Sequence, residues 1–316
     1  MKISVLGNGH VGSAVFERLK QMRELSEIML IGRNEDKILG EIEDYKDAEV
    51  FDILPTPKVD GGGYEKIINS DIIVYTISMA APAEFTRRDQ ICSANIKLTN
   101  EIIEKIRPYC KNDPFIIVIT NPLDVITYQF SKSGLTKENR IIGTGTMLES
   151  ARLARRIAYF FDISPRSVYA PVVGEHGSSA VTIWSVLKVS GHDIDTYASN
   201  DMMKSVKIER VFLEENMKKQ GWKIQTLKGN TNHGVVSIVI YIINAIIHDT
   251  KEIMNVSTSM LSKYGYTEFA LSVPCIIGAG GIRDVILLKM TREEKEELDK
   301  SAEVLRNMIR CVQIGL

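Results

Sequence analysis

Three glycines near the start of the sequence have the spacing of a phosphate-binding loop. They are Gly7, Gly9 and Gly12 in VLGNGHVG, where an apolar run precedes the loop and a helical pattern follows it. This G-x-G-x-x-G order suits a dinucleotide, because the turn is tight, the backbone approaches the pyrophosphate closely and helix N–H groups point at the anion. We therefore expect the loop, including His10 and Val11, to contact a cofactor. An exposed His10 without a ligand is the alternative for that side chain.

The residues after the second apolar run point to a cofactor with an additional phosphate. Dinucleotide-binding chains place an acid about 20 residues after the glycine loop, where it binds the ribose hydroxyls, but this chain has Gly32 there. Without that carboxylate, Arg33 can hold a ribose 2′-phosphate through a charge-assisted contact, and Asn34 can add a donor. The sequence therefore predicts that NADP(H) is preferred over NAD(H). The alternative is that Arg33 points to solvent, that Glu35 or Asp36 replaces the missing acid, and that NAD(H) is the cofactor.

Three further stretches place polar groups where a substrate could reach them. Asn121 follows an apolar run in TNPLDVIT and could hydrogen-bond a substrate oxygen or a nicotinamide amide. His176 lies in GEHGSS between Gly174 and Gly177, which let a backbone and a ligand approach closely. The run IIGTGTMLESARLARR lies between these two stretches, over residues 141–156. These stretches supply the candidates for the chemical step.

In this order, the glycine loop and the three stretches resemble the L-lactate/malate dehydrogenase family, and the resemblance covers nearly the whole chain. Within the family, the NPxDVIT, IGTGT and GEHG runs are most similar to the L-2-hydroxyisocaproate dehydrogenase branch. The resemblance implies an oxidoreductase that transfers a hydride between a nicotinamide cofactor and an L-2-hydroxy acid/2-oxo acid pair. It also implies that the protein is a homodimer or a homotetramer.

The resemblance also implies roles for single residues. His176 would be the acid/base that protonates the 2-oxo oxygen, a role that suits a side chain with a pKa near the working pH. Arg152 in the SAR run would bind the substrate carboxylate, and Arg88 would polarise the carbonyl when its loop closes. Asn121 would contact the substrate or the nicotinamide, and Thr231 in KGNTNHG would line the pocket.

One departure from the family pattern concerns the partner of the catalytic histidine. The family has an aspartate in LDSAR, and this chain has Glu149 in LESAR. The longer carboxylate can still orient the imidazole, but the geometry must shift, and such shifts cost rate. We expect the same type of reaction, with a weakly catalytic dinucleotide-binding protein as an alternative. A surface ion pair between Glu149 and Arg152, three residues apart on a helix, is the other interpretation of this carboxylate.

A second departure concerns substrate choice. The substrate-selecting position in the loop before Arg88 is Pro82, within the small apolar run 80–83. Malate dehydrogenases resemble one another in having arginine there, and many lactate dehydrogenases have glutamine. The apolar run favours a monocarboxylic 2-oxo acid, because a second carboxylate would be buried without a partner. An NAD(P)-dependent malate dehydrogenase is the alternative, since a shifted loop could aim Arg87 into the site.

Alternating apolar and helical stretches are expected to position these residues. Strands are predicted at 3–6, 28–31, 72–77, 115–120 and 140–142, and helices over 11–20, 35–48, 89–107 and 124–133. This α/β pattern predicts an N-terminal Rossmann domain, a doubly wound parallel sheet covered on both faces, over residues 1–143. A C-terminal α+β catalytic domain is predicted over 144–316, with helices at 149–161, 195–219, 232–250 and 291–312 and strands at 168–173, 181–183, 186–189 and within 256–288.

The composition excludes several classes of function. The 316 residues carry a net charge of −1, so the chain lacks the basic surface that nucleic acids or membranes attract. Four scattered cysteines have no zinc-site spacing, so we expect reduced thiols and no metal. The chain starts directly with a strand, and its most apolar stretch, 235–247, is too short to span a bilayer. We therefore expect a cytoplasmic protein that binds a small molecule, with no nucleic-acid or membrane partner.

The resemblance also bears on regulation. Lactate dehydrogenases that a sugar bisphosphate activates carry an arginine two residues after the carboxylate-binding arginine and a histidine seven residues before the catalytic one. This chain has Ala154 and Tyr169 at those places. We therefore expect no sugar-bisphosphate effector.

Overall fold

The computed structural model describes residues 1–79, 88–197 and 206–314. In this part of the chain one large sheet has nine strands in the order β14-β13-β12-β6-β5-β4-β1-β2-β3. Its six N-terminal strands are parallel neighbours. They are β1 (Lys2–Leu6), β2 (Glu27–Ile31), β3 (Lys58–Gly62), β4 (Ile72–Tyr75), β5 (Phe115–Val118) and β6 (Ile141–Gly143). The central place of β1 between β2 and β4 confirms the predicted Rossmann order.

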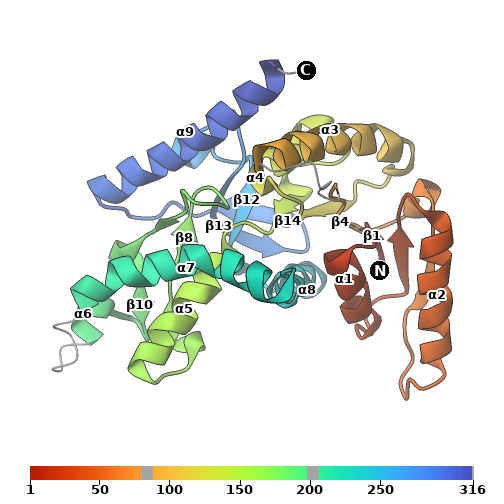
Figure 1. The fold of residues 1–316 in the computed structure, drawn as a ribbon, viewed down its shortest axis with the longest axis horizontal. Coiled ribbons are helices and arrows are strands. Elements are labelled where there is room, and N and C mark those ends of the chain that lie inside the picture. The colour runs from red at the N-terminus through yellow and green to blue at the C-terminus, as the bar shows by residue number, and fades with distance from the viewer. Residues whose placement is uncertain (80–87, 198–205, 315–316) are drawn as a thin grey trace.

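Helices join these strands and cover both faces of the sheet (Figure 1). The helices are α1 (His10–Lys20), α2 (Glu35–Glu49), α3 (Arg88–Ile106) and α4 (Leu123–Ser133). Apolar side chains of α1 and α2 pack on one face, and those of α3 and α4 pack on the other. Because all six strands run in the same direction, their carboxyl ends and the loops that follow them lie along a single edge.

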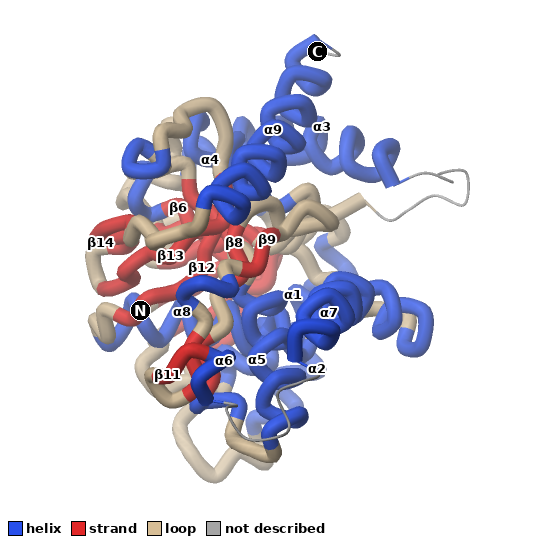
Figure 2. The backbone as a smooth tube through the Cα atoms, turned by 90° about the vertical axis from the view of Figure 1, so that its left-hand side faces the viewer, coloured by secondary structure: helices blue, strands red, loops and turns tan. Residues whose placement is uncertain are grey.

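The second half of the chain combines helices with two small sheets and the last strands of the large sheet. Its helices are α5 (Met147–Phe161), α6 (Ile194–Tyr197), α7 (Val206–Lys228), α8 (His233–His248) and α9 (Arg292–Ile314). Its strands are β7 (Val168–Tyr169), β8 (Val172–Val173), β9 (Val181–Thr182), β10 (Lys188–Val189), β11 (His192–Asp193), β12 (Glu252–Thr258), β13 (Leu271–Gly278) and β14 (Gly281–Val285). Figure 2 shows the strands in the middle of the molecule, with α3 and α9 on one side and α1 and α8 on the other.

Short 3-10 helices connect several of these elements. They are η1 (Tyr64–Ile67), η2 (Arg107–Tyr109), η3 (Glu138–Arg140), η4 (Pro165–Ser167), η5 (Trp184–Val186) and η7 (Ser262–Tyr264). The first of them, η1, directly follows β3 and therefore lies at the same edge as the glycine loop.

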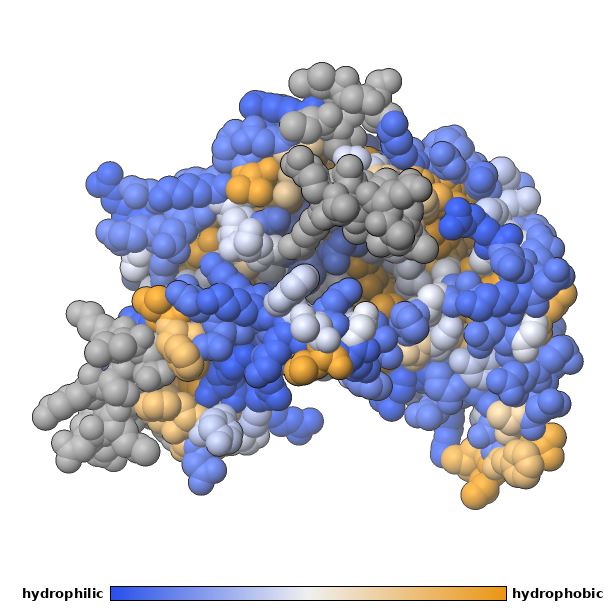
Figure 3. Space-filling model, viewed as in Figure 1, coloured by the Kyte–Doolittle hydropathy of each residue, from blue (hydrophilic) through white to orange (hydrophobic). Residues whose placement is uncertain are grey.

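Two groups of large apolar side chains are exposed on the surface. One group directly follows α2 and comprises Val50, Phe51, Ile53 and Leu54, which are 80%, 85%, 97% and 50% exposed. In Figure 3 it forms the orange area at the lower right, where α2 ends in Figure 1. The other group lies on α7 and comprises Val211, Phe212, Trp222 and Leu227. Among the described residues, no helix is both long and apolar enough to cross a membrane.

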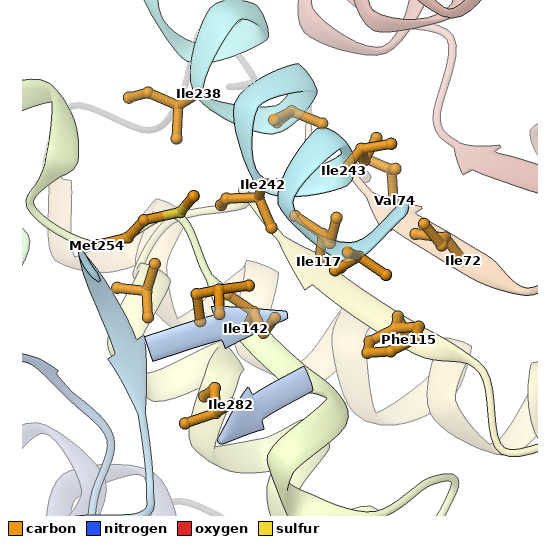
Figure 4. Packing of buried hydrophobic residues seen from close by; sticks show 14 of the residues in the cluster. Ile72, Val74, Phe115, Ile117, Ile142, Ile238, Ile242, Ile243, Met254 and Ile282 are labelled. Carbon is orange, nitrogen blue, oxygen red and sulfur yellow. The ribbon is translucent and has the colours of Figure 1, made fainter. Parts of the chain in front are cut away.

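Helix α8 joins the two halves of the chain into one core. Its apolar residues, which include Ile238, Ile242 and Ile243, belong to the same buried cluster as Val74 and Ile117 of the parallel strands. Figure 4 shows this helix lying across those strands. The sheet also continues past the predicted boundary at residue 143, because β12 pairs antiparallel with β6. The predicted helix over 232–250 is therefore confirmed as a buried core helix.

Two predicted elements differ in detail from the structure, and one strand was not predicted. The predicted strand over 168–173 is two strands, β7 and β8, that belong to different sheets, and Pro171 between them has no N–H group to continue a ladder. The predicted helix over 195–219 covers α6 and part of α7, which continues to Lys228; residues 198–205 of this prediction lie outside the described residues. Strand β3 was not predicted, because its sequence KVDGG ends in glycines. Gly61 is needed there, since a Cβ would lie 2.7 Å from the Leu30 carbonyl oxygen.

Candidate active site

The glycine loop joins the end of β1 to the start of α1. Gly7 has a φ of +110°, a conformation that favours glycine, and a Cβ on Gly12 would overlap the Gly7 carbonyl oxygen. Below the loop, the Thr76 hydroxyl donates to the Leu6 carbonyl at 2.9 Å. By contrast, a Cβ on Gly9 would meet no atom within 4 Å. Gly7 and Gly12 therefore close the turn, whereas Gly9 leaves open space above it.

This open space has the electrostatics of an anion site. Gly9 is the N-cap residue of α1, no side chain caps the helix there, and its first turn contains no acidic residue. The first N–H groups of α1, together with the positive end of the helix dipole, therefore face the space above Gly9. His10 is exposed at the start of α1 and Val11 is half-buried. These residues fit the pyrophosphate of a dinucleotide.

The end of β2 places Gly32, Arg33 and Asn34 beside the glycine loop. The Gly7 N–H donates to the Ile31 carbonyl at 2.7 Å, and the three nearest atoms to a Cβ on Gly32 would belong to Ile38 and Asn8. Arg33 and Asn34 are exposed. Asn34 has a second role that its sequence position had not suggested, because its side-chain oxygen caps α2 by accepting the Lys37 N–H at 3.0 Å. A ribose site at this edge therefore has a cation and no carboxylate at the usual position.

Buried hydrogen bonds tie the next two strand ends together. Asn95 of α3 is 3% exposed and donates from Nδ2 to the Asn121 carbonyl at 2.7 Å. Its Oδ1 accepts the Met79 N–H, also at 2.7 Å. The Asn121–Pro122 peptide is cis, and Asn121 itself is exposed at the carboxyl edge. Asn95 therefore fixes the chain after β4 against the chain after β5, a role that the sequence analysis did not assign to it.

The structure brings His176, Glu149 and Arg152 together. The His176 Nδ1 lies 3.3 Å from Glu149 Oε2, and Arg152 donates from a terminal nitrogen to Glu149 Oε1 at 3.2 Å. The exposed fractions of these side chains are 24% for His176, 9% for Glu149 and 11% for Arg152. The Glu149–Arg152 pair is therefore not the surface ion pair that the sequence left open. At this distance the two atoms form an ion-pair contact, and neither has a hydrogen-bond partner among the described residues.

A buried aspartate holds the backbone of the histidine. Asp124 follows the cis peptide at the start of α4 and is 2% exposed. Its Oδ2 accepts the His176 N–H at 2.7 Å, and its Oδ1 accepts the Ser257 hydroxyl at 2.6 Å. Sequence reasoning quoted this aspartate in TNPLDVIT without assigning it a role. Asp124 lies three residues after Asn121, and its hydrogen bond to His176 connects the TNPLDVIT stretch with the GEHGSS stretch.

These charges control the ionisation of the site. Burial lowers the pKa of His176, but the carboxylates of Glu149 and Asp124 outweigh it and raise the pKa to about 9. Burial raises the pKa of Glu149, yet His176 and Arg152 together hold it below its usual value. Burial raises the pKa of Asp124 to about 6, against the Ser257 hydroxyl and the His176 N–H. At neutral pH the imidazole is therefore charged and can donate a proton.

The other sequence candidates lie in a loop, at a helix start or outside the described residues. Thr231 is half-buried in the loop between α7 and α8, and α8 starts against α5, since a Cβ on Gly234 would lie 2.8 Å from Leu148. Arg88 is the first residue of α3. Pro82 and Arg87 lie in 80–87, outside the described residues. Within the described ranges, no group of three or more His, Cys, Asp or Glu side chains could hold a metal ion.

The sequence matches two domain models of one known protein family. The NAD binding domain model of lactate/malate dehydrogenases matches residues 1–143, and their alpha/beta C-terminal domain model matches residues 146–314. The chain belongs to the lactate/malate dehydrogenase family. L-lactate dehydrogenase 2 of Clostridium acetobutylicum is 34% identical over 311 residues, which cover 98% of this chain and 96% of that protein. L-lactate dehydrogenase of Clostridium perfringens is 33% identical over 309 residues, with the same coverage.

Solved structures agree with this assignment. The minor L-lactate dehydrogenase from Enterococcus mundtii, in a ligand-bound form, has a TM-score of 0.90 and 27% identity, and covers 98% of both chains. This member of the family is therefore an L-2-hydroxy acid dehydrogenase of lactate dehydrogenase type that uses a nicotinamide cofactor. The similarity to the L-2-hydroxyisocaproate branch stays a prediction.

Proposed function

We propose that the protein reduces monocarboxylic 2-oxo acids to L-2-hydroxy acids, with NADPH preferred over NADH. Residues 1–143 would bind the dinucleotide, and residues 144–316 would supply the acid/base and the carboxylate-binding groups. The observation that carries the reaction type is the contact of His176 with Glu149, beside the Arg152 guanidinium. A protonated imidazole beside a buried cation that can bind a carboxylate suits a 2-oxo acid.

The chain's own residues would act as follows. When bound, the nicotinamide supplies or accepts the hydride at the substrate C2. His176 donates a proton to the 2-oxo oxygen, and in the reverse direction it accepts the proton from the hydroxyl. Glu149 and Asp124 stabilise the charged imidazole before the transfer, because both raise its pKa. Arg152 is oriented by Glu149 and binds the substrate carboxylate.

The remaining candidates would complete the substrate pocket. The exposed Asn121 side chain would contact the substrate or the nicotinamide, and Thr231 would line the pocket from the loop before α8. Arg88 would polarise the carbonyl. The apolar run around Pro82 would select a monocarboxylic substrate, and Arg87 carries the alternative of a malate dehydrogenase.

The weakly catalytic alternative depends on Glu149. The longer side chain does reach the imidazole, at 3.3 Å, and it keeps its charge because its pKa is lowered. The contact supports a working acid/base rather than a non-catalytic binding protein. The 3.3 Å contact without a hydrogen bond is the reason to expect that the geometry limits the rate.

The preference for NADPH rests on the end of β2. Gly32 removes the usual ribose carboxylate, and the exposed Arg33 follows it directly. Glu35 and Asp36 lie in the first turn of α2, and the alternative with NADH needs one of them to hold the ribose hydroxyls. A charge-assisted contact to a phosphate contributes about 1.5–3 kcal/mol, which corresponds to a preference of roughly 10- to 100-fold.

Initial rates test the cofactor and the substrate together. NADPH and NADH are compared at matched concentrations with 2-oxoisocaproate, pyruvate and oxaloacetate. We expect kcat/KM to be at least about tenfold higher with NADPH, and oxaloacetate to be the poorest substrate. An NADH preference would contradict the role of Arg33. Oxaloacetate as the best substrate would contradict the role of Pro82 and favour Arg87 as the selecting residue.

The exposed apolar groups support a homo-oligomer. Three neighbouring apolar side chains are each at least 80% exposed, namely Val50, Phe51 and Ile53. A group of such exposed apolar side chains is typical of a surface that another protein covers. We expect a dimer or tetramer of this chain, which sedimentation equilibrium would distinguish from a monomer. Cys110 and Cys275 are free thiols, which fits the reducing conditions of the proposed cytoplasmic location.

A further inference from the structure

The loop that carries His176 lies against helix α9. It joins the end of β8 at Val173 to the start of β9 at Val181, and α9 packs against β9 (Figure 2). Backbone hydrogen bonds join Gly174 to Ser272 of β13 in both directions, at 2.9 Å and 3.1 Å. The start of the loop is therefore fixed to the large sheet, and α9 is placed to hold the residues that follow.

The two glycines that flank His176 make room for protein atoms. A Cβ on Gly174, whose φ is +95°, would lie 2.7 Å from the Ser301 Oγ of α9. A Cβ on Gly177 would overlap the Glu175 carboxylate, which folds back over the loop. The sequence pattern predicted close approach of a backbone and a ligand at these glycines. In the structure the atoms that approach belong to α9 and to the loop itself.

Hydrogen bonds form a closed ring that starts and ends on Glu175. The Glu175 N–H donates to Ser301 Oγ at 2.8 Å, and the Ser179 hydroxyl donates to the Glu175 carboxylate. Because that hydrogen is used, the Ser301 hydroxyl donates to Ser179 Oγ, which lies 3.1 Å away. The Ser179 N–H donates to the same carboxylate at 3.1 Å. Each hydroxyl both donates and accepts, so the hydrogen bonds of the ring strengthen one another.

Two successive N–H groups of this loop are held by side chains of different helices. Ser301 of α9 is fully buried and accepts the Glu175 N–H. Asp124 of α4 accepts the next one, the His176 N–H, at 2.7 Å. The imidazole contacts Glu149 of a third helix, α5, at 3.3 Å. With both N–H groups held, the loop has little freedom to turn, and Nδ1 stays within reach of that carboxylate.

We propose that Ser301 is a positioning residue for the acid/base, because its hydroxyl holds the N–H before His176 and so keeps the imidazole against Glu149. This inference rests on the proposed role of His176 and adds a residue of α9 to the groups on which the reaction depends. Removal of the hydroxyl leaves a buried N–H without an acceptor, which is costly. The loop would then move toward another acceptor, and small displacements of a reacting group lower the rate.

Steady-state rates across pH 5–10 test this inference. Ser301→Ala is compared with the wild type, Ser179→Ala and His176→Gln, with pyruvate and whichever of NADPH and NADH gives the higher rate. The matched control is Ser70→Ala, which also removes a buried serine hydroxyl, one that lies 2.6 Å from Ser4 Oγ before the start of β4. The thermal midpoint shows whether each variant is folded, and fluorescence titration gives its affinity for the cofactor.

We expect Ser301→Ala to lower kcat at neutral pH about 10- to 100-fold, with little change in cofactor affinity, because the glycine loop lies on other strands. The fall in the reduction rate, expected near pH 9 in the wild type, should move to lower pH as the imidazole loses its contact with Glu149. Ser179→Ala breaks the ring but leaves an acceptor for the Glu175 N–H, so both changes should be smaller. Ser70→Ala should match the wild type in kcat and in pH profile.

The possible failures can be told apart. Wild-type rates in His176→Gln would overturn the proposed function and the role of Ser301 with it. If His176→Gln is inactive but Ser301→Ala keeps the wild-type kcat and pH profile, only the role of Ser301 is wrong, even if its thermal midpoint falls. If Ser301→Ala does not fold, Ser179→Ala takes its place. A profile shifted to lower pH in that variant would support the proposal, and a wild-type profile would overturn it.

Discussion

The proposed cofactor edge and the proposed acid/base centre lie in one molecule but are built in different ways. At the cofactor edge the shape comes from the backbone, since Gly7 and Gly12 let the chain pass over itself and no side chain caps α1. At the acid/base centre the geometry comes from buried charges, since Glu149 contacts His176 and Asp124 holds its N–H. The first site depends on open space and the second on charge. Substitutions should therefore reduce cofactor binding at the first site and change the pH dependence of the rate at the second.

The largest effect is expected from Glu149→Gln, which removes charge from the acid/base centre and keeps the shape. In the proposed mechanism, reduction of the 2-oxo acid needs protonated His176, so the rate of the wild type should fall as pH rises through about 9. Without Glu149, burial dominates and the pKa of His176 drops, so this fall should move to lower pH. At neutral pH we expect kcat to decrease about 10²- to 10⁴-fold. Rates of reduction and of oxidation across pH 5–10 measure both changes.

Glu294→Gln is the matched control for this variant. Glu294 is also a buried carboxylate, but it accepts hydrogen bonds from Ser185 and Thr291 at the start of α9. Its replacement should leave the pH profile unchanged. If Glu149→Gln kept the fall in rate near pH 9, another group would have to stabilise the charged imidazole, and the proposed role of Glu149 would be wrong.

The same contrast explains what could be predicted from the sequence. The strand–helix alternation and the glycine loop are local patterns, so the sequence predicted the parallel sheet and the position of the loop. Strand β3 was missed because its glycines serve the packing of α2, which is a tertiary contact. The motif match singled out His176, Glu149 and Arg152, but not the burial of the Glu149–Arg152 pair. Asp124 and Asn95 act through contacts 52 and 26 residues away in sequence, which no local pattern contains.

An intermediate effect is expected at the glycine loop. Two substitutions of the same size there should distinguish the loss of space for the cofactor from the loss of folding stability. Gly9 has a φ of −81° that any residue adopts, and a Cβ there meets no protein atom within 4 Å. Gly9→Ala should therefore keep the thermal midpoint and weaken NADPH binding about 10-fold or more, because the methyl group occupies the space of the pyrophosphate. Fluorescence titration with NADPH measures the affinity.

Gly12→Ala provides the contrast to Gly9→Ala. A Cβ at residue 12 would overlap the Gly7 carbonyl oxygen, so this variant should lose thermal stability as well as cofactor binding. Equal stability of the two variants would show that the loop adjusts more easily than the close packing indicates. Unchanged NADPH affinity in Gly9→Ala would mean that the pyrophosphate does not cover this place.

The smallest effect is expected from Asp124→Asn, which tests whether a group that only positions the histidine also tunes it. The asparagine oxygen can still accept the His176 N–H, so the loop should stay in place, but the negative charge is lost. Because Asp124 raises the pKa of His176 less than Glu149 does, the fall in the reduction rate should move to lower pH by less than in Glu149→Gln. We expect kcat at neutral pH to change less than about tenfold, because the substitution changes a charge but keeps the hydrogen bond.

The matched control is Asp113→Asn, which makes the same substitution at the opposite end of β5, beside Arg140 and Lys137. It lies far from the histidine and should leave the pH profile unchanged. A purely structural role for Asp124 would lower the amount of folded protein and leave the pH midpoint where it is, so a shifted midpoint at full thermal stability is the result that only electrostatic tuning produces.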